Sequence, residues 1–567
     1  MNLKTFLENF DTIAEAPGGI SKLRSLILDL AVRGKLVPQN PEDEPAELLR
    51  NQIVVEKQNL EKLKKIAKQR SLTPVQEDEQ PYVLPSNWCW CRWNDVALHI
   101  GDIDHKMPTE VSEGIPYVSP RDFKEENTID FEGAKKISYE DFERLKRKVQ
   151  PTKGDIIFPR YGTIGENRLV EVDIDFLASY SCAVIKNFHG YIEPKYSYYY
   201  SISKLVKSEI ERYTNKTTQA NVGIQSIQNF IYPLPPLAEQ KRIVEKVDEL
   251  MGLCDRYESA KQARDNLRQK LRESAIASLM NAETDENLDA TWAFVRDNWH
   301  NLSQNPEDID TLRQVILQLA VRGKIVPQNA NDESALVLLK SINSDKRDKT
   351  ASKGRKANDI PLLKSSEIPY LIPDNWKWIR LSDILLSSFY GPRFSKEEYT
   401  NDGIVSIRTT DMTTRGEILL KDPPRIPISK GKLDLYKLEK EDLLVTRSGS
   451  IGTMAIFRGD YLAIPSAYLI RFRFSKFILV DYIYRFLQSP FGQSLLGLGT
   501  TKLAQPNINA NAISRFALPL PPLAEQKRIV AKVDELMQLC DRLEASLRES
   551  QQRAESLAAS AVSHLTI

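Results

Sequence analysis

The chain has 567 residues, and its 78 Lys plus Arg nearly balance 77 Asp plus Glu, which gives a formal net charge of +1. With 41% hydrophobic and 27% charged residues, the composition is typical of a globular protein with several domains of ~150 residues, and it excludes a supercharged or grossly disordered chain. The apolar runs, such as 156–158, are too short for the ~18 residues that span a bilayer, and Lys4 and Glu8 interrupt the N-terminal stretch that a secretion signal would need.

Cysteine usage and local charge refine this description. The five cysteines are odd in number and form no CxxC pair, which favours neither a disulfide framework nor a zinc site. We therefore expect a cytoplasmic, reduced protein without a membrane segment. Residues 370–522 carry 20 Lys plus Arg against 14 Asp plus Glu, whereas residues 82–236 carry 19 against 21, so only the later segment is basic.

The first expected helix covers residues 23–32, where apolar residues recur at helical spacing before Gly34, a typical helix-ending residue. The segment 23–40, which contains Leu-Ala-Val-Arg-Gly-Lys-Leu-Val-Pro-Gln-Asn, returns almost unchanged at 312–329, an offset of 289 residues. Three later landmarks return in the same order at offsets of 288, 287 and 286 residues. The chain therefore consists of two copies of one unit of about half its length.

A polar linker follows each copy of this helix, at 41–81 and at 331–369. In the first linker, Leu60, Leu63 and Ile66 have helical spacing within a Lys-rich stretch. In the second linker, the basic stretch from Lys346 to Lys356 is typical of a mobile segment.

A segment of about 150 residues comes next in each copy, and its short apolar runs predict strands and turns with some helix. Examples are 155–158 and 443–446. Each segment begins with Asn-Trp-x-Trp, and we expect Trp88, Trp90, Trp376 and Trp378 to be core residues. The tyrosines at 196, 198, 199 and 200 favour core and sheet packing over base stacking.

Each globular segment ends in Pro-Leu-Pro-Pro-Leu, and Ala-Glu-Gln-Lys-Arg-Ile-Val then opens a long helix, expected at 239–280 and at 525–563. Apolar residues step by 4 and 3 along both helices, the seam of a coiled coil, and in the second helix the seam extends to Leu557. A seam needs a partner. We therefore expect the C-terminal helix to pack beside the N-terminal helix, closing the chain into a ring with approximate two-fold symmetry.

The expected fold is α+β: two globular mixed α/β domains separated by long antiparallel helical, coiled-coil spacers, in an internal tandem duplication with pseudo-two-fold symmetry. The predicted parts are an N-terminal helical segment at 1–40, a linker at 41–81, a first globular domain at 82–236, a central helical region at 237–330, a linker at 331–369, a second globular domain at 370–522 and a C-terminal helix at 523–567.

The sequence lacks the common motifs of enzymes. It contains no GxxxxGK[ST], HExxH or GxSxG, and its five histidines are not clustered at metal-ligand spacing. Asp422-Pro-Pro-Arg425 is similar to an amino-methyltransferase motif but has Arg425 in place of the stacking aromatic, so we interpret it as a loop. Gly497-x-Gly499 lacks a third glycine.

Polar residues in paired positions are the candidates for DNA contact. Arg160 and Arg447 follow predicted strands and precede glycine turns, where an arginine could fork onto guanine or could pair with a carboxylate. Two polar loops and an arginine–aspartate pair supply further donors and acceptors, with a satisfied polar loop as the alternative. The candidates are Arg121, Arg160, Tyr161, Thr163, Lys216, Thr217, Thr218, Gln219, Asn221, Arg408, Thr409, Thr410, Arg447, Ser448, Ser450, Thr500, Thr501, Lys502, Gln505 and Asn507.

The duplicated Asn-Trp-x-Trp, Arg-x-Gly-x-Ile-Gly and Pro-Leu-Pro-Pro-Leu-Ala-Glu-Gln-Lys-Arg-Ile-Val motifs, together with the helical segments at 23–40 and 312–329, resemble the specificity (S) subunit of type I restriction–modification systems. The resemblance covers essentially the whole chain. It implies a non-catalytic DNA-reading subunit whose globular domains are target recognition domains, each gripping one half of a bipartite, asymmetric site in double-stranded DNA.

The resemblance also implies partners. Two modification (M) subunits, which bind S-adenosylmethionine and methylate adenine, would dock on the helices, and two restriction (R) subunits would add translocation and cleavage driven by ATP and Mg²⁺. We expect no cofactor on this chain. Two alternatives remain open at this stage: a coiled-coil scaffold that does not read DNA, and a stand-alone DNA methyltransferase or nuclease.

Overall fold

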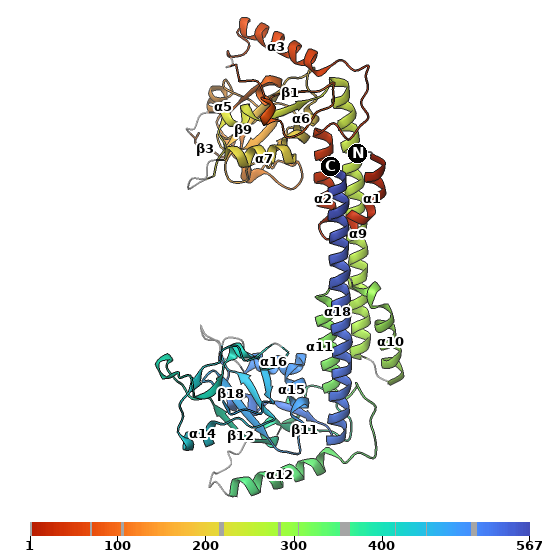
Figure 1. Ribbon diagram of the computed structural model, residues 1–567, viewed down its shortest axis with the longest axis vertical. Helices are drawn as coiled ribbons and strands as arrows, with labels where there is room; N and C mark the ends of the chain where they lie inside the picture. The colour runs from red at the N-terminus through yellow and green to blue at the C-terminus, as the bar shows by residue number, and fades with distance from the viewer. Residues whose placement is uncertain are drawn as a thin grey trace. The chain divides into compact units, whose positions relative to one another are not determined.

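The structure is a computed structural model that describes residues 3–68, 71–103, 107–214, 220–281, 285–303, 305–351, 363–413, 415–448, 451–499 and 507–566. It divides into two compact units, of which unit 1 comprises residues 1–264 and 550–567 and unit 2 comprises residues 265–549 (Figure 1). Each unit contains one mixed α/β body, named body 1 (residues 82–236) and body 2 (residues 370–522). The predicted α+β class and tandem duplication are confirmed.

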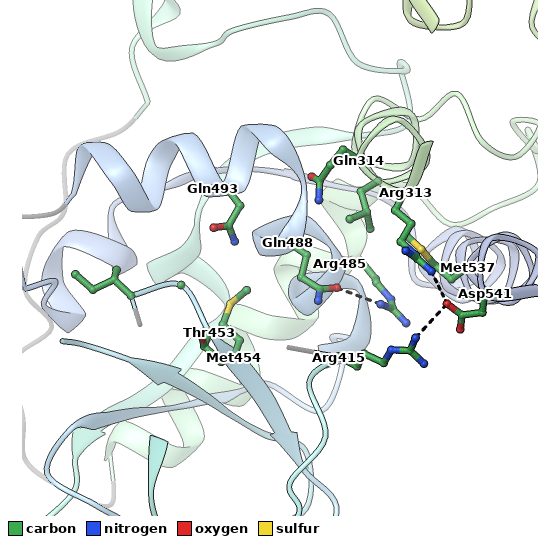
Figure 2. A pocket seen from close by; sticks show the side chains of 13 residues that line it. Arg313, Gln314, Arg415, Thr453, Met454, Arg485, Gln488, Gln493, Met537 and Asp541 are labelled. Carbon is green, nitrogen blue, oxygen red and sulfur yellow. Dashed lines mark hydrogen bonds and ion pairs between the residues drawn. The ribbon is translucent and has the colours of Figure 1, made fainter. Parts of the chain in front are cut away.

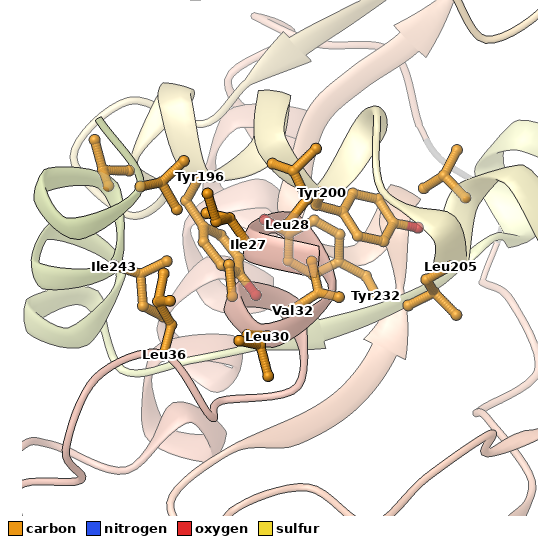
Figure 3. Packing of buried hydrophobic residues seen from close by; sticks show 14 of the residues in the cluster. Ile27, Leu28, Leu30, Val32, Leu36, Tyr196, Tyr200, Leu205, Tyr232 and Ile243 are labelled. Atoms are coloured by element: carbon orange, nitrogen blue, oxygen red, sulfur yellow. The ribbon is translucent and has the colours of Figure 1, made fainter. Parts of the chain in front are cut away.

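The helical part of each unit begins with the repeated segment. In unit 1, α1 (Leu3–Glu15) precedes α2 (Gly19–Val32), and in unit 2, α10 (Asp285–Leu302) precedes α11 (Asp308–Val321). Figure 3 shows Ile27, Leu28 and Leu30 of α2 packed among the tyrosines of body 1. The helix predicted at 23–32 and its copy are confirmed as α2 and α11, and α2 packs against body 1.

A glycine turn ends both of these helices. Gly34 has φ +66°, and a Cβ placed on it would lie 2.5 Å from Cγ of Pro85. Gly323 has φ +71°, and its Cβ would lie 2.6 Å from Cγ of Pro373. A side chain cannot be accommodated at either position without moving the proline, which explains why Arg-Gly-Lys occurs in both copies.

Body 1 contains a four-stranded sheet in the order β2-β9-β6-β7, a second in the order β3-β5-β4-β8, and the pair β1-β10. Its strands are β1 (Cys89–Arg92), β2 (Ala97–Gly101), β3 (Glu110–Val111), β4 (Ile115–Val118), β5 (Lys135–Ile137), β6 (Ile156–Pro159), β7 (Arg168–Leu169), β8 (Leu177–Ala178), β9 (Cys182–Asn187) and β10 (Ile231–Leu234). Its helices are α4 (Trp93–Val96), α5 (Tyr139–Leu145), α6 (Pro194–Ser201), α7 (Lys204–Tyr213) and α8 (Ile224–Asn229).

Body 2 repeats this plan with the sheets β12-β18-β15-β16 and β14-β13-β17 and the pair β11-β19. Its strands are β11 (Lys377–Arg380), β12 (Leu385–Tyr390), β13 (Ile404–Ile407), β14 (Arg425–Ile426), β15 (Asp442–Thr446), β16 (Met454–Phe457), β17 (Ala463–Pro465), β18 (Leu469–Phe474) and β19 (Ala517–Leu520). Its helices are α13 (Leu381–Ile384), α14 (Lys430–Tyr436), α15 (Val480–Gln488), α16 (Pro490–Leu498) and α17 (Ala510–Ser514). The strands predicted at 155–158 and 443–446 correspond to β6 and β15.

Aromatic side chains fill the core of body 1. Tyr196 and Tyr200 are fully buried, and their hydroxyls donate to the carbonyl oxygens of Pro233 and Ile231, both at 2.8 Å. Trp93 packs edge-on against Tyr200 with ring centroids 5.1 Å apart. The interpretation of these tyrosines as packing residues is confirmed for Tyr196 and Tyr200, because neither ring can reach a nucleobase.

The two long helices are α9 (Leu237–Asn281) and α18 (Leu523–Thr566), each slightly longer than predicted. The first part of α9 buries Ile243 and Val247 in the core of unit 1, and the first part of α18 buries Ile529 and Val533 in the core of unit 2. Residues 550–567 belong to unit 1, where Ala558 is fully buried in the same core cluster as Phe10 of α1 and Leu23 of α2. The predicted packing of the C-terminal helix with the N-terminal helix is confirmed.

The predicted seam is wrong at its C-terminal end. Leu557 is 59% exposed, and the buried residue is its neighbour Ala558. Ala554 packs partly against the core, and the next residue of α18 in that core is Ala558, four residues later, and not Leu557, three residues later. A straight helix with 3.6 residues per turn drifts away from a strict 4-3 seam in this way.

The two linkers contain packed helices, α3 (Ala46–Lys62) and α12 (Ala335–Ala351). Ile53 in α3 and Ile342 in α12 are fully buried, so neither linker is a wholly polar connection. The basic stretch from Lys346, interpreted above as mobile, begins inside α12, and its remainder lies outside the described residues. Leu63 is 65% exposed, so the Leu60–Leu63–Ile66 spacing does not mark one buried face.

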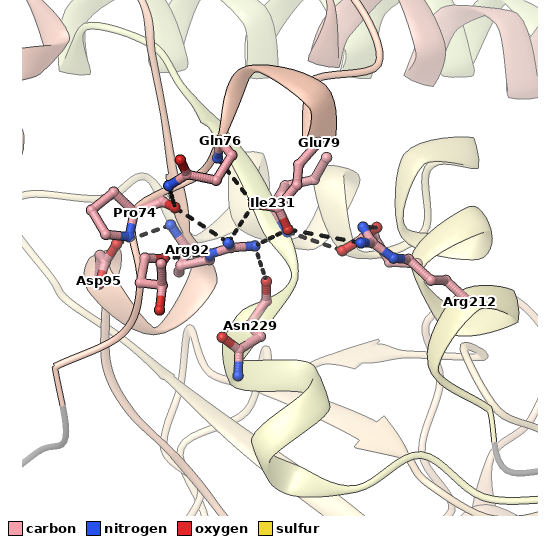
Figure 4. Close-up of polar contacts among 10 residues, drawn as sticks. Pro74, Gln76, Glu79, Arg92, Asp95, Arg212, Asn229 and Ile231 are labelled. Carbon is pink, nitrogen blue, oxygen red and sulfur yellow. Dashed lines mark hydrogen bonds and ion pairs between the residues drawn. The ribbon is translucent and has the colours of Figure 1, made fainter.

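An arginine joins the end of the first linker to body 1. Arg92 donates to Glu79 Oε2 at 2.6 Å and to the carbonyl oxygen of Asn229 at 3.1 Å (Figure 4). In unit 2, Arg380 pairs in the same way with Glu367 at 2.9 Å. Body 1 and the chain that leads into it are therefore cross-linked by a buried guanidinium. Among the described residues, no helix is long and apolar enough to cross a membrane.

Candidate nucleic-acid interface

The predicted arginine of body 1 is buried. Arg160 directly follows β6, and its side chain is 8% exposed. One nitrogen of its guanidinium forms a salt bridge with Asp102, and its Nε donates to the carbonyl oxygen of Val222 at 3.0 Å. Of the two alternatives at this position, the structure contains the carboxylate pair and not an arginine that is open to solvent.

The matching arginine of body 2 has different surroundings. Arg447 directly follows β15 and is half-buried. Its guanidinium lies over the ring of Tyr390, 4.7 Å from the centroid, and its Nε donates to Asn507 Oδ1 over a long 3.4 Å. Among the described residues it forms no salt bridge. Stacking on an aromatic ring leaves the edge of a guanidinium available for further acceptors.

Asp102 and Tyr390 occupy the same place in the two bodies. In the first sheet, Gly101 pairs with Val184 and Ile156 pairs with Ile185. In the second sheet, Phe389 pairs with Arg471 and Leu443 pairs with Phe472. These registers superimpose Gly101 on Phe389, so the next residue is Asp102 in one body and Tyr390 in the other. At this place the arginine therefore meets a carboxylate in body 1 and an aromatic ring in body 2.

The other two candidate arginines, Arg121 and Arg408, do not occupy equivalent positions in the two bodies. Asp122 accepts from the backbone nitrogen of Ser119 at 2.7 Å, and Asp411 accepts from the backbone nitrogen of Arg408 at 2.8 Å. Arg408 therefore corresponds to Ser119, and Arg121 corresponds to Thr410. The expectation that the two segments match holds for the aspartates only, because two residues separate Arg408 from Asp411, whereas Arg121 directly precedes Asp122.

The guanidinium of Arg408 forms its hydrogen bonds within body 2. Its Nη2 donates to Asp411 Oδ1 at 2.9 Å and to the carbonyl oxygens of Lys421 and Asp422 at 3.1 and 3.2 Å. Asp411 raises the pKa of the Arg408 guanidinium through this hydrogen-bonded pair. Thr409 and Thr410 lie in the same short 3₁₀ turn, Thr409–Asp411, and Thr410 is exposed.

A polar hollow in body 1 brings together three of the predicted residues. Arg121, Tyr161 and Thr163 line a cavity of ≈ 750 Å³, together with Lys135, Ser179 and Ser181. Arg121 is exposed, and no described residue forms an ion pair with its guanidinium. Lys135 is paired with Glu110 at 2.9 Å. This hollow has the donors and acceptors that contact phosphates and base edges.

Two candidate asparagines stabilise the loops beside these arginines. Tyr161 forms an isolated β-bridge with Asn221, and Ser448 forms the equivalent bridge with Asn507. Asn221 and Asn507 are therefore each joined to the residue that directly follows the candidate arginine of their body. The remaining candidates lie outside the described residues; they are Lys216, Thr217, Thr218, Gln219, Ser450, Thr500, Thr501, Lys502 and Gln505.

Sequence reasoning missed the partners that decide which arginine is available. Asp102 and Tyr390 were not among the candidates, although a signal for them exists. They are separated by 288 residues, the same offset as the two Asn-Trp-x-Trp motifs, so aligning the copies exposes an aspartate-to-tyrosine difference directly after an apolar strand.

Unit 2 has a further polar hollow of ≈ 540 Å³ between body 2 and its helices (Figure 2). Arg313, Arg415 and Arg485 line it, and all three have carboxylate partners. Arg313 and Arg415 reach Asp541 at 2.7 and 3.5 Å, and Arg485 reaches Asp534 at 2.7 Å. Their charges are therefore already neutralised within the unit. Within the described part of the chain, no three His, Cys, Asp or Glu side chains gather as a metal site.

Comparison with known proteins identifies the family. The sequence profile described as "Type I restriction modification DNA specificity domain" matches residues 85–264 and 373–551, more than half of the chain and once in each copy. The chain belongs to the family of type I restriction–modification specificity subunits. The resemblance stated from the sequence is thereby confirmed.

Two members of this family match over almost the full length. The type I restriction enzyme EcoEI specificity subunit of Escherichia coli is 30% identical, over 95% of this chain and 93% of that protein. The EcoAI specificity subunit of the same species is 29% identical, over 95% and 92%. A chain in a solved structure of a type I R-M system is 19% identical, with 86% of this chain and 99% of that chain covered and a TM-score of 0.47.

Proposed function

We propose that this chain is the DNA specificity subunit of a type I restriction–modification complex, in which body 1 reads one half of a bipartite, asymmetric site in double-stranded DNA and body 2 reads the other half. The carrying observation is that the family's DNA specificity segment occurs twice, once on each body. The two bodies share their strand registers but differ at Asp102 and Tyr390, and different side chains on one frame are what two unlike half-sites require.

The candidate DNA contacts support this proposal through their location. In both bodies the arginine after the buried strand lies at one end of the sheet, and an asparagine bridges to the residue that follows this arginine. Loops at the end of a rigid sheet are a common location for recognition residues, because the sheet fixes their position while their side chains vary. The candidates outside the described residues remain proposals.

The proposed partners are two M subunits, which dock on the helices, and two R subunits. In this arrangement the chain itself is not an enzyme and carries no cofactor: S-adenosylmethionine belongs to the M subunits, and ATP and Mg²⁺ belong to the R subunits. The proposed surroundings are cytoplasmic. The long helices α9 and α18 would act as coiled-coil spacers between the target recognition domains, and the predicted domain boundaries at 82–236 and 370–522 define what each body contributes.

The test is a domain exchange. Residues 82–236 are replaced by the corresponding body of the EcoEI relative, and the adenine methylation of a host that carries the complete complex is mapped. One half of the methylated sequence should change and the other should stay. A change in both halves would refute independent readout, and methylation without any bipartite pattern would refute the proposed function.

A further inference from the structure

The two bodies contain the same number of candidate arginines near their recognition loops, but they engage them in opposite ways. In body 1, Arg160 is buried against Asp102, whereas Arg121 is exposed at a polar hollow. In body 2, Arg408 is paired with Asp411, whereas Arg447 stacks on Tyr390. Each body therefore has one candidate arginine that is held by a carboxylate and one that is not.

We propose that Arg121 in body 1 and Arg447 in body 2 are the arginines that determine which bases the chain selects, and that Arg160 and Arg408 are positioning residues. This inference rests on the proposed function and names the residues that perform it. The ligand chemistry is the pair of acceptors on the major-groove edge of a guanine, which a guanidinium contacts through two parallel hydrogen bonds.

The geometry separates the two roles. A guanidinium that already donates to a carboxylate and to backbone carbonyls has few N–H groups left to donate to a base. Turning it toward DNA would also leave its carboxylate partner buried and without a counter-charge. Arg160 has such partners in Asp102 and Val222, and Arg408 has them in Asp411, Lys421 and Asp422. The Arg160–Asp102 pair and the bonds from Arg408 to the carbonyl oxygens of Lys421 and Asp422 cross from one loop to another, so their effect is to fix the loops near the available arginine.

Arg447 has a different kind of support. The ring of Tyr390 lies under its guanidinium at 4.7 Å, and the hydroxyl of Tyr390 accepts from the backbone nitrogen of Ala510 at 2.9 Å. The ring is thus fixed at both ends, by β12 and by α17. A stacked arginine is held in a plane without losing its hydrogen-bond donors, which lowers the entropy that DNA binding would otherwise cost.

The difference between the bodies can be reversed at one position. Tyr390→Asp places a carboxylate where Asp102 stands in body 1, so Arg447 should become internally paired as Arg160 is. This variant retains Arg447 itself. A loss of selectivity would therefore follow from changing the availability of the arginine and not from its removal.

The experiment uses the chain in its complete complex with the modification subunits. Adenine methylation is mapped first for the native complex, which gives the sequence of its recognition site. Binding of the complex is then measured for a DNA duplex that carries this site and for duplexes with a single base-pair substitution in one half-site. Arg121→Gln should reduce the preference for the native over the substituted base pair by about 10- to 100-fold at one position of the half-site read by body 1. Arg447→Gln and Tyr390→Asp should have the same effect at one position of the half-site read by body 2. Arg144→Gln and Arg458→Gln are the matched controls, since they remove an exposed arginine from body 1 and from body 2 outside these loops.

The outcomes are distinguishable. Uniform weakening on all duplexes would mean that Arg121 or Arg447 contacts a phosphate, and it would overturn the assignment of base selection. Unchanged discrimination in Arg447→Gln, with a native melting temperature, would overturn it as well. If the native complex methylates no bipartite site at all, the proposed function fails before the roles of these arginines are tested.

Discussion

The indole nitrogen of Trp88 donates to Glu239 Oε2 at 2.9 Å, and both side chains are buried. The other carboxylate oxygen of Glu239 accepts from Nε2 of Gln39 at 2.5 Å. Unit 2 repeats this arrangement: Glu525 accepts from Trp376 at 2.9 Å and from Gln328 at 2.5 Å. Three sequence motifs that lie far apart thus meet at one carboxylate in each unit, which gives a physical reason for their joint duplication.

We predict that the Trp88–Glu239 pair is energetically coupled. Glu239→Ala leaves two buried donors without an acceptor and should destabilise unit 1 by about 1–3 kcal/mol. A double-mutant cycle with Trp88→Phe, followed by urea unfolding, should give a coupling free energy above ~0.5 kcal/mol. Strictly additive effects would show that the hydrogen bond contributes nothing, and Glu525→Ala is the matched variant in unit 2.

A second prediction concerns pH. Lys57 of α3 is buried and donates to the carbonyl oxygen of Asn94 at 2.5 Å, and burial lowers the pKa of its ammonium group from 10.5 to about 8. Between about pH 8 and pH 10.5 the unfolded chain therefore binds more protons than the folded chain, so stability from this group rises with pH. The stability of the native chain relative to Lys57→Met should increase over this range, on the order of 1 kcal/mol.

Unfolding midpoints in urea at pH 8 and pH 10 measure this effect. Lys62→Met is the control, because Lys62 lies on the same helix and is exposed. If the difference in the free energy of unfolding between the native chain and Lys57→Met stays constant with pH, the prediction for Lys57 is contradicted. For Lys62→Met a constant difference is the expected result.

A third prediction concerns the spacer. Inserting four residues near Ser274 lengthens α9 by ~6 Å. Because α18 contributes Leu543 to one core and Ala558 to the other, the same insertion is needed near Ser550. With both insertions, the gap between the half-sites should grow by about one or two base pairs at ~3.4 Å each, while the half-sites keep their sequences. Methylation mapping decides: an unchanged gap would mean that the helices do not set the spacing.

A fourth prediction is that the purified chain alone transfers no methyl groups, hydrolyses no ATP and cleaves no DNA. The reason is the absence of the corresponding motifs from its sequence. Incubation with labelled S-adenosylmethionine, with ATP and with DNA tests each activity separately. Methyl transfer without an added partner would favour the stand-alone methyltransferase alternative.

Much of the fold could be predicted because its signals are local or repeated. Gly34 marks the end of α2, the proline motif before Leu237 marks the start of α9, and the short apolar run at 156–158 marks β6. The linker helix α3 was not predicted at its proper place. It buries Ala46, Leu49 and Ile53, but its opposite face also carries apolar residues, Leu48 and Val55, so that no single stripe stands out.

The candidate site was predicted only in outline. Arg160 was assigned to the correct turn, but its partner Asp102 lies 58 residues away, and no local pattern links the two. The correspondence of Arg408 with Ser119 depends on the 3₁₀ turns that follow β4 and β13, which place the aspartate four residues after the end of the strand in both bodies. Such relationships follow from strand register, which spacing along the chain does not determine.

The burial of Ala558 in the core of unit 1 has a consequence for how the chain is made. Synthesis proceeds from the N-terminus, and domains generally fold as their residues emerge. Residues 1–264 precede unit 2 in the chain, yet Ala554 and Ala558 of α18 contribute to the same core as α1 and α2. Unit 2 has its full set of residues at Glu549, whereas unit 1 waits for the final segment. The half of the protein that is begun first is therefore completed last, and an interrupted chain would release a finished second half attached to an unfinished first half.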